Sequence, residues 1–496
     1  MRASRLPSCD EAPTPVKRCV AFDLGATSGR VMVAEVGADT LRLDEVHRFP
    51  NGAVRHEDGS LRWDVERIRA ELLLGLRAAA GSGPVDGIGV DSWAIDYGLL
   101  DADGRLLGAP YSHRDGRTDG VREKVVAQLG GESMLYDVTG IQQLPFNTLY
   151  QLVAAKDSKE YAEARTLLLL PDLITYWLTG RRVAERTNAS TTQFLDATTR
   201  EWAVPLLERL GLRTDLLPEL VDAGETVGTL LSEVAAEVGL PEETPVIAVG
   251  SHDTASAVVG VPMEVASAAY ISSGTWSLVG LELPQPVLTE EARRADFTNE
   301  AGVDGTVRLL KNVMGLWVLS ECVREWGADL PDLLARAHAE PDLGSVVDVD
   351  DPSLLPPGDM PARLRALAET AGEPVPSTEV GMVRMVLDSL ALAYRRTVRT
   401  ASSIASVRLE VVHVVGGGSQ NELLCQLTAD ACGLPVVAGP AEAAALGNVL
   451  VQARSLGEPL RDLAAMRALL RRTQLLRTYE PNGVSGDWDA AEKRLG

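Results

Sequence analysis

The chain has 496 residues, 45% of them hydrophobic and 24% charged, so it is long enough for two or more domains with buried cores. It carries 47 Lys and Arg against 70 Asp and Glu, a formal net charge of −23. This acidic balance argues against nucleic acid or an anionic membrane surface as a partner. Because the sequence has no apolar run of membrane-spanning length and no apolar targeting segment, we expect a soluble cytoplasmic protein.

The first elements along the chain predict a β-hairpin. Residues 1–17 combine prolines with mixed charges, and we expect a disordered tail there. From Cys19, the sequence CVAFDLGATSGRVMVAEV places a turn rich in Gly, Ser and Thr between two apolar strands. From Ala268, AAYISSGTWSLVGLEL repeats this design around residues 272–275. Two similar hairpins predict an internal duplication.

Helical and strand patterns alternate along the rest of the chain, which predicts an α/β fold. VERIRAELLLGLRAAA is typical of a helix and DGIGVDSWAIDYGLL of strands. Further on, MGLWVLSECVREW and VGMVRMVLDSLALAYRRTV predict helices, and LEVVHVVGGG predicts a strand. An acidic, proline-rich connector runs from Glu340 to Pro361, and we expect it to be a surface excursion or the margin of a lid. We place the domain boundary near residues 259–268, where two lobes would meet at a cleft.

The two Gly/Ser/Thr turns are candidate phosphate sites. In DLGATSGR, small residues allow backbone N–H groups to approach phosphate oxygens, Thr27 and Ser28 offer hydroxyl donors, and Asp23 could hold a hydrated Mg²⁺. An ordinary glycine-rich turn is the alternative. The second turn, SSGTWS, favours nucleotide binding, because two turns can grip a polyphosphate from both sides of a cleft. The sequence has neither a Walker A loop nor a GxGxxG after a strand, so a P-loop and a dinucleotide-binding motif are excluded, and a nucleotide would be held in another way.

A third glycine cluster, Gly416, Gly417 and Gly418, lies between a predicted strand and a helix that starts near Asn421. Close approach of the backbone to a flat adenine ring explains three glycines. The alternative is a strand-to-helix turn with positive φ, which explains one of them well.

The stretch GSHDTASA carries the strongest candidate for chemistry. His252, Asp253 and Thr254 follow an apolar strand and precede small residues suited to a packed helix. An Asp at this place could accept a hydroxyl proton during phosphoryl transfer. The alternative is that Asp253 caps the helix, which Asp does commonly.

Two weaker signals concern a polar ligand. In DSWAIDYG, Trp93 lies between Asp91 and Asp96, a combination suited to stacking on a sugar and hydrogen-bonding it; a buried Trp with solvated acids is the alternative. Lys311 and Asn312 precede an apolar helix, where the amide could bind a polar ligand. The six His and five Cys show no metal-ligand spacing, so we expect no tightly bound transition metal.

Taken in order, DLGATSGR, DSWAIDYG, GSHDTASA, ISSGTWSLVG, KNVMGLWVLSE and GGGSQN resemble the FGGY carbohydrate kinase family. HRFPNG, GIQQLPFNTLYQL and TNASTTQFLD add to the match, which runs from about Cys19 to Tyr479. The resemblance implies a two-lobed actin-like ATPase fold, in which duplicated ribonuclease-H-like domains enclose a ligand cleft. It implies an N-terminal kinase domain at 18–260 with the sugar side, the first phosphate hairpin and the catalytic Asp. A C-terminal kinase domain at 266–456 would hold the second hairpin and the adenosine side, and 457–496 would be a C-terminal extension.

The resemblance also implies an activity and its residues. ATP would phosphorylate L-rhamnulose at O1, in L-rhamnose catabolism, with Asp253 as proton acceptor and Mg²⁺ as cofactor held through water by Asp23. The implied substrate contacts are Ala94, His252, Asp253, Thr254 and Asn312. The implied ATP contacts are Ala26, Thr27, Ser28, Gly29, Arg30, Thr275, Ser320 and Gly417. Ala94 stands where members often have Gly, and Ser320 where some have Gln.

Two alternatives to this activity remain open. The first is a kinase of the same family for another ketose, such as L-fuculose or L-xylulose. The second is a non-catalytic sugar sensor, against which the retention of Asp253 and of both turns argues. The expected partners are a small-molecule sugar and ATP, with no nucleic acid and no membrane, and we expect a monomer or a small homo-oligomer.

Overall fold

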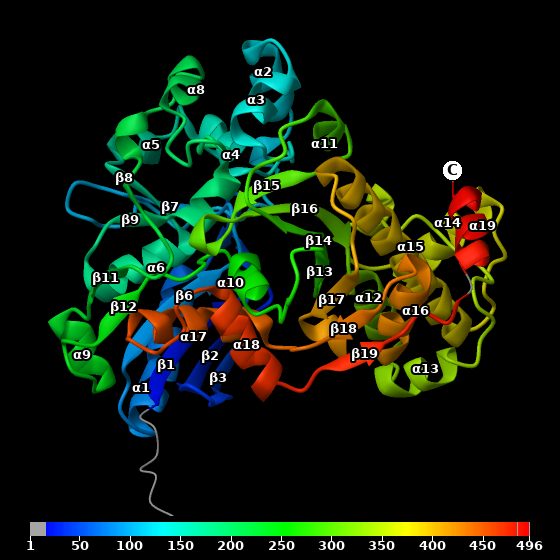
Figure 1. Ribbon diagram of the computed structural model, residues 1–496. Coiled ribbons are helices and arrows are strands. Elements are labelled where there is room, and N and C mark those ends of the chain that lie inside the picture. The colour runs from blue at the N-terminus through cyan, green and yellow to red at the C-terminus, as the bar shows by residue number, and fades with distance from the viewer. Residues whose placement is uncertain (1–15, 484, 496) are drawn as a thin grey trace, which may run out of the picture.

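The computed structural model describes residues 16–483 and 485–495, which form an α/β molecule built on two β-sheets (Figure 1). The tail predicted at residues 1–17 lies outside the described residues except for its last two positions, and strand β1 begins at Lys17. None of the described helices is long and apolar enough to cross a membrane.

The first sheet has six strands in the order β3-β2-β1-β6-β12-β11. Its first three strands along the chain are antiparallel neighbours, β6 and β12 continue the sheet in parallel with β1, and β11 ends it antiparallel. The strands are β1 (Lys17–Leu24), β2 (Ser28–Val36), β3 (Leu41–Pro50), β6 (Gly87–Ser92), β11 (Thr226–Thr229) and β12 (Pro245–Ile247).

The second sheet repeats this order as β16-β14-β13-β17-β18-β19, with β15 added outside β16. Again three strands are antiparallel, two follow in parallel, and the last, β19, is antiparallel. The strands are β13 (Ala268–Ser273), β14 (Trp276–Leu283), β15 (Thr298–Ala301), β16 (Val307–Met314), β17 (Val411–Val415), β18 (Val436–Ala438) and β19 (Arg477–Tyr479). The matching orders confirm the α/β fold and the duplication that the two hairpins predicted.

The helices cover both sheets and contribute to several hydrophobic cores. One face of the first sheet packs on α1 (Val65–Gly81), α6 (Leu170–Thr179) and α9 (Ser232–Val238). In α1, Ile68, Leu72 and Leu76 recur at four-residue spacing and are buried, as the sequence pattern predicted. The opposite face packs on α17 (Ala443–Ser455) and α18 (Leu463–Thr473), although both come from the second half of the chain.

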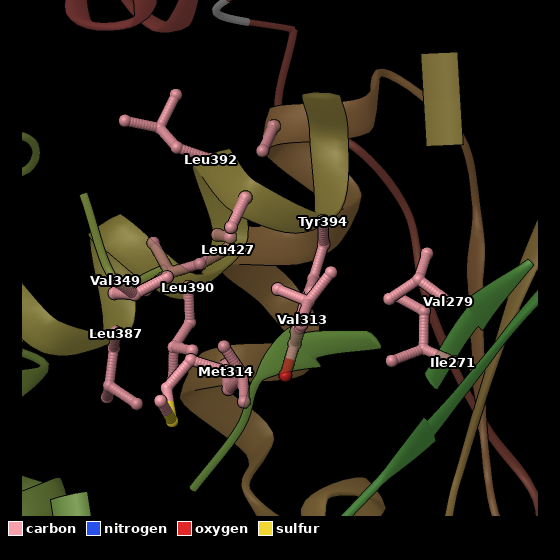
Figure 2. Packing of buried hydrophobic residues seen from close by; sticks show 14 of the residues in the cluster. Ile271, Val279, Val313, Met314, Val349, Leu387, Leu390, Leu392, Tyr394 and Leu427 are labelled. Atoms are coloured by element: carbon pink, nitrogen blue, oxygen red, sulfur yellow. The ribbon is translucent and has the colours of Figure 1, made fainter. Parts of the chain in front are cut away.

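The second sheet packs on the long helix α15 (Glu379–Ala405) and its neighbours. Figure 2 shows Leu387, Leu390 and Tyr394 of α15 in the same core as Ile271 and Val279 of the sheet. The neighbouring helices are α12 (Trp317–Trp326), α13 (Leu330–Ala337), α14 (Met360–Ala371), α16 (Glu422–Cys432) and α19 (Ser485–Arg494).

Helices α10 (Asp253–Val259) and α17 contact each other closely between the two sheets (Figure 1). A Cβ atom added to Gly447 would lie 1.8 Å from the Ser256 carbonyl oxygen, and one added to Gly260 would lie 2.2 Å from that of Ala443. Only glycine fits at such a crossing. The middle and the end of α10 are thereby packed against a helix from the second half of the chain. The boundary that we expected near residues 259–268 falls between α10 and β13.

The connector from Glu340 to Pro361 has exposed positions but is anchored in the core at several others, so the prediction of a surface excursion was wrong for those positions. The margin of a lid stays a prediction. Val346, Val347 and Val349 within it are fully or almost fully buried in the core of the second sheet. The backbone N–H of Val347 donates to Ser389 Oγ of α15 at 3.0 Å. The acidic and proline residues masked these few apolar positions in the sequence pattern.

The remaining elements are smaller insertions and turns. The strands are β4 (Ala53–Arg55), β5 (Leu61–Trp63), β7 (Tyr97–Leu100), β8 (Thr166–Leu169), β9 (Val183–Glu185) and β10 (Glu219–Val221). The α-helices are α2 (Val121–Leu129), α3 (Glu132–Thr139), α4 (Thr148–Ala155), α5 (Lys159–Glu163), α7 (Arg186–Ala189), α8 (Val204–Arg209) and α11 (Glu290–Arg294). The short 3₁₀ helices are η1 (Gly116–Thr118), η2 (Ser190–Thr192), η3 (Thr214–Leu216), η4 (Val303–Gly305), η5 (Pro352–Leu354) and η6 (Gly417–Gln420).

Candidate active site

The first turn, residues 25–27, joins β1 to β2 and presents Ala26 and Thr27 at its tip. The Gly25 N–H donates to the Ser28 carbonyl oxygen at 2.9 Å, which closes the turn. Asn51 holds it from outside: its Nδ2 donates to the Gly25 carbonyl and its backbone N–H to that of Thr27, each at 2.9 Å. Asn51 was not among the residues singled out from the sequence. Thr27 is exposed, so its hydroxyl is accessible to a ligand.

Packing in the sheet explains why residue 29 is a glycine, and the sequence pattern did not show this. It follows the turn in β2, and a Cβ atom there would lie 2.3 Å from the ring of Phe49 in β3. Phe49 is almost fully buried, so the ring cannot move aside easily. The glycine is therefore required by the fold, whatever its N–H group binds.

Arg30 connects the first turn to the second half of the chain. Its guanidinium forms ion pairs with Asp23 at the end of β1 and with Glu442, the residue before α17. Burial disfavours its charged form, but the two carboxylates outweigh this effect and raise the pKa of Arg30. The positive charge of Arg30 is shared between two acids in this arrangement.

The second turn, residues 274–275, joins β13 to β14 and lies against two glycine segments. A Cβ atom on Gly315 would lie 2.7 Å from the carbonyl oxygens of both Gly274 and Thr275. On the other side, Cβ atoms on Gly416 and Gly418 would lie 2.8 Å and 2.0 Å from the Ser273 carbonyl and hydroxyl oxygens.

The three glycines at 416–418 therefore differ in purpose. Gly416 has a φ of 80° and packs on Ser273, and Gly418 packs on the same residue, so both are explained by the fold. A Cβ atom on Gly417 would contact nothing within 4 Å. Close approach to a ligand thus remains an explanation for Gly417 alone.

Asp253 is the first residue of α10 and does not cap it. His252 occupies the cap position, and its side chain makes no capping hydrogen bond. The Asp253 side chain is 33% exposed, and its Oδ1 accepts a hydrogen bond from Thr254 Oγ1 at 3.0 Å. The helix-cap alternative therefore fails on geometry, and the carboxylate is left accessible at the start of a helix.

Three carboxylates gather where the first sheet ends. Asp23 and Asp91 are register partners on β1 and β6, and both are buried. Burial raises the pKa of Asp91 well above its usual range, and the charges of Asp23 and Asp253 raise it further. Burial likewise raises the pKa of Asp23, with Arg30 opposing and Asp253 contributing. Oδ1 of Asp91 has no hydrogen-bond partner among the described residues, whereas Oδ2 accepts from Asn448 of α17 at 2.6 Å.

The stretch after β6 makes a strained turn at Ala94. The Asp96 N–H donates to the Ala94 carbonyl oxygen at 2.9 Å, and Ile95 between them has a φ of 70°. Such a conformation is unfavourable for a β-branched residue, so the surrounding structure must enforce it. Strained residues of this kind cluster at active sites and ligand-binding sites. Ala94 and Ile95 are half-buried, so this turn faces accessible space.

Asp96 anchors that turn from below. It is fully buried and accepts hydrogen bonds from Trp63 Nε1, Trp93 Nε1, His113 Nδ1 and Gln151 Nε2 at 2.7 to 3.0 Å. Burial opposes its ionisation, but His113 and the other donors hold its pKa below the usual value. Trp93 is buried, as the alternative had it, but Asp91 and Asp96 are buried as well and not solvated. The buried Trp93 ring does not support the prediction that it stacks on a sugar. Trp93 packs at 4.3 Å from the ring of Trp63.

The segment that carries His252 is held by Glu185, which was missed from the sequence. Buried Glu185 accepts from the Ser251 N–H at 3.0 Å and from Ser251 Oγ at 2.8 Å, and it also caps α7 through Thr187. His252 forms an isolated bridge with Ser92 at the end of β6. These contacts bring Ala94 and Asp253 to the same end of the first sheet.

The other predicted residues lie on the second sheet and its helices. Asn312 is half-buried on β16, in register with Leu278, and Ser320 is exposed on α12. Within residues 16–483 and 485–495, no hydrogen bond or ion pair joins either side chain to Asp253. Among the described residues, no group of three His, Cys, Asp or Glu side chains has the arrangement of a metal site.

Comparisons with known proteins agree with this architecture. The sequence model described as the FGGY family of carbohydrate kinases, N-terminal domain, matches residues 18–260, and the model of the C-terminal domain matches residues 269–456. The chain is 44% identical over 482 residues to a rhamnulokinase of Pectobacterium carotovorum subsp. carotovorum (strain PC1), covering 95% of both chains. It is 42% identical over 475 residues to a rhamnulokinase of Bacteroides thetaiotaomicron, covering 95% of this chain and 97% of the relative.

Solved structures resemble it in fold. A ligand-bound xylulose kinase from Lactobacillus acidophilus has a TM-score of 0.78 at 18% identity and covers 96% of each chain. A glycerol kinase from Plasmodium falciparum with ADP has a TM-score of 0.77 at 14% identity and covers 97% of each chain. The two-lobed architecture is thus shared at low sequence identity.

Proposed function

Because this chain belongs to the FGGY family of carbohydrate kinases, we propose that it transfers the γ-phosphoryl group of ATP to O1 of L-rhamnulose. The products would be L-rhamnulose 1-phosphate and ADP, in the cytoplasmic catabolism of L-rhamnose. Support for the sugar comes from relatives named rhamnulokinase, which are 41% to 44% identical over nearly the whole chain. The family membership supports a sugar kinase independently of that choice.

Asp253 is the proposed proton acceptor, and its geometry is the observation that carries the mechanism. The carboxylate is accessible, is not used as a helix cap, and stands next to two other acids at the end of the first sheet. Thr254 Oγ1, at 3.0 Å from Oδ1, orients the carboxylate.

The two turns are the proposed phosphate sites. Ala26, Thr27 and Ser28 would contact phosphate oxygens from the first sheet, and Thr275 from the second. Thr27 and Thr275 are both exposed at the tips of their turns, which supports this role. We assign the adenosine side to Gly417, because it is the one glycine of its cluster without a packing neighbour. Ser320 would lie on that same side.

The residues present fit a Mg²⁺ ion that enters with ATP. Asp23 and Asp91 supply hard oxygen ligands of the kind that Mg²⁺ prefers. The two carboxylates repel each other, and the positive charge of Arg30 offsets only part of this repulsion. We propose that Asp23 holds the ion through water. When bound, Mg²⁺ would neutralise charge on the transferred phosphoryl group.

The proposed transfer is a single displacement. The sugar hydroxyl at C1 loses its proton to Asp253 as O1 forms a bond to the γ-phosphorus, and the bond from that phosphorus to the bridging oxygen of ADP breaks. The protein would contribute mainly alignment and charge compensation. Sugar contacts would come from the Ala94 backbone, His252, Thr254 and the Asn312 amide.

A sugar panel tests the proposal. ADP release would be measured with Mg-ATP and L-rhamnulose, L-fuculose, L-xylulose, D-ribulose or glycerol. We expect kcat/KM to be highest by far for L-rhamnulose. A higher value for another ketose would retain the family chemistry and refute the assigned sugar. The absence of turnover with every sugar would favour the sensor alternative.

A further inference from the structure

Glu300 and Arg308 form a buried ion pair beside the candidate active site. They are directly opposite one another on the antiparallel strands β15 and β16. Arg308 Nη2 lies 3.0 Å from Glu300 Oε2, and the exposed fractions of the two side chains are 0% and 8%. A buried ion pair contributes little net stability, because desolvation offsets the attraction. Arg308 Nη1 also has no hydrogen-bond partner among the described residues, so this pair is not optimised for the fold.

The pair meets the imidazole of His252. Glu300 Oε2 lies 3.0 Å from His252 Nδ1, and Arg308 Nη2 lies 3.3 Å from the same nitrogen. On the other side of the ring, Nε2 lies 3.5 Å from Asp253 Oδ1. The ring therefore stands between an ion pair of the second sheet and the proposed proton acceptor at the start of α10.

The backbone of His252 is held separately by the first half of the chain. Its bridge with Ser92 ties it to the end of β6, and its N–H donates to Thr187 Oγ1 at 3.4 Å. Main chain and side chain of this one residue are thus fixed by different sheets. The orientation of the ring depends on Glu300 and Arg308, whereas the place of the residue does not.

Glu300 is present as a carboxylate. Burial opposes its ionisation, but Arg308 and His252 outweigh burial and lower the pKa of Glu300 below its usual value. The guanidinium of Arg308 can only donate, and its Nη2 forms a hydrogen bond with His252 Nδ1 at 3.3 Å, so Nδ1 is the acceptor. The ring proton therefore belongs on Nε2, which faces Asp253 Oδ1 at 3.5 Å. Glu300 Oε2 lies 3.0 Å from the same Arg308 Nη2 and fixes the guanidinium in this place.

We propose that Glu300 and Arg308 are positioning residues for phosphoryl transfer, which hold His252 with its proton on Nε2 so that Nε2 donates a hydrogen bond to a sugar hydroxyl oxygen. Asp253 then takes the proton from the neighbouring C1 hydroxyl of the same sugar. Glu300 acts through Arg308, by holding the guanidinium against His252 Nδ1. This inference rests on the proposed sugar kinase function and assigns it two residues of the second sheet.

Glu300→Gln tests the kinetic part, with the sugar that the wild type turns over fastest. We expect kcat/KM for that sugar to fall about 10- to 100-fold, the range typical of lost outer-shell partners, with KM for ATP within twofold of wild type. Asp388→Asn is the matched control, because Asp388 forms a buried ion pair with Arg384 at 3.0 Å within α15, in the core of the second sheet. It should leave both constants within twofold of wild type.

If Glu300→Gln does not fold, Glu300→Asp replaces it. The Asp side chain keeps the negative charge but is one methylene shorter, so its carboxylate lies farther from its partners. We then expect a loss of kcat/KM for the sugar with KM for ATP unchanged. Binding of ADP, followed by thermal shift, verifies that each variant has an intact nucleotide side. Equal kcat/KM values for wild type and a folded Glu300 variant would overturn the proposal, as would a loss that falls equally on KM for ATP.

Nuclear magnetic resonance of protein labelled with ¹⁵N-histidine tests the tautomer without any turnover. The chain has six histidines, and the signal of His252 is identified by its loss in His252→Gln. We expect the bare nitrogen of His252 to be Nδ1 in the wild type, and the proton to redistribute between the two nitrogens in Glu300→Gln. A tautomer that does not respond to Glu300 would overturn the inference. If the tautomer responds but no sugar is phosphorylated, the positioning stands and the proposed function falls.

Discussion

Gly417 and Gly418 are adjacent in η6, yet the structure assigns them opposite sensitivities to a methyl group. A Cβ atom on Gly418 would lie 2.0 Å from Ser273 Oγ and 2.5 Å from Ser273 Cβ, and Ser273 is almost fully buried. Overpacking of this kind costs about 1–3 kcal/mol. A Cβ atom on Gly417 contacts nothing within 4 Å, so Gly417→Ala should change the free energy of unfolding by less than about 0.5 kcal/mol.

The functional effects should be reversed. Because Gly417 is assigned to the adenosine side, its new methyl group would occupy space that the nucleotide needs, and we expect KM for ATP to rise about 10-fold, equivalent to about 1.4 kcal/mol. The two variants would be compared by urea denaturation and by kinetics at saturating sugar. An unchanged KM for ATP in a stably folded Gly417→Ala protein would refute the assignment of Gly417 to the nucleotide.

Three other predictions address packing, charge and pH. Gly447→Ala should destabilise the protein by about 1–3 kcal/mol in urea, because its Cβ atom would lie 1.8 Å from the Ser256 carbonyl oxygen; unchanged stability would show that α10 and α17 can separate freely. Arg30→Met should raise KM for Mg-ATP about 10-fold or more, because two acids would then face the polyphosphate without a counter-charge, and an unaltered KM would contradict the role of Arg30. Burial and nearby arginines lower the pKa of His413 from 6.5 to about 4, so the unfolded chain binds the extra proton and stability is lost as pH falls from 6.5 to 4. His413 should contribute about 3 kcal/mol to this loss in urea titrations, and His413→Gln should lack that contribution when the two proteins are compared over the same pH window.

The sequence was most informative where a pattern is local. Both hairpins, the α/β class, the duplication and the helix α1 follow from alternation, glycine-rich turns and helical spacing, all of which act over a few residues. The segments around Asp253 and the two turns were likewise visible as short motifs. The family models and the relatives agree with the family that these motifs indicated, and the solved structures agree with the fold.

The partners of these residues could not be predicted in the same way. Arg30 pairs with Glu442, which is 412 positions away, and His252 meets Glu300 and Arg308 only because the second sheet is placed beside α10. No local pattern distinguishes Glu300 from the other acids of an acidic chain. The connector after Glu340 was misjudged for a related reason, because a few buried valines in a polar segment outweigh its composition once α15 lies beside them.

The most direct test of the account is the product formed from L-rhamnulose and Mg-ATP, compared between the wild type and Asp253→Asn. We predict that the wild type forms one phosphomonoester at O1 for each ADP, identified by ³¹P and ¹³C nuclear magnetic resonance. The variant should fold and retain its ATP affinity, with kcat reduced at least 100-fold, since it loses the proton acceptor but no helix cap. Phosphate at another position, ADP without a sugar ester, or equal rates in the two proteins would contradict the account.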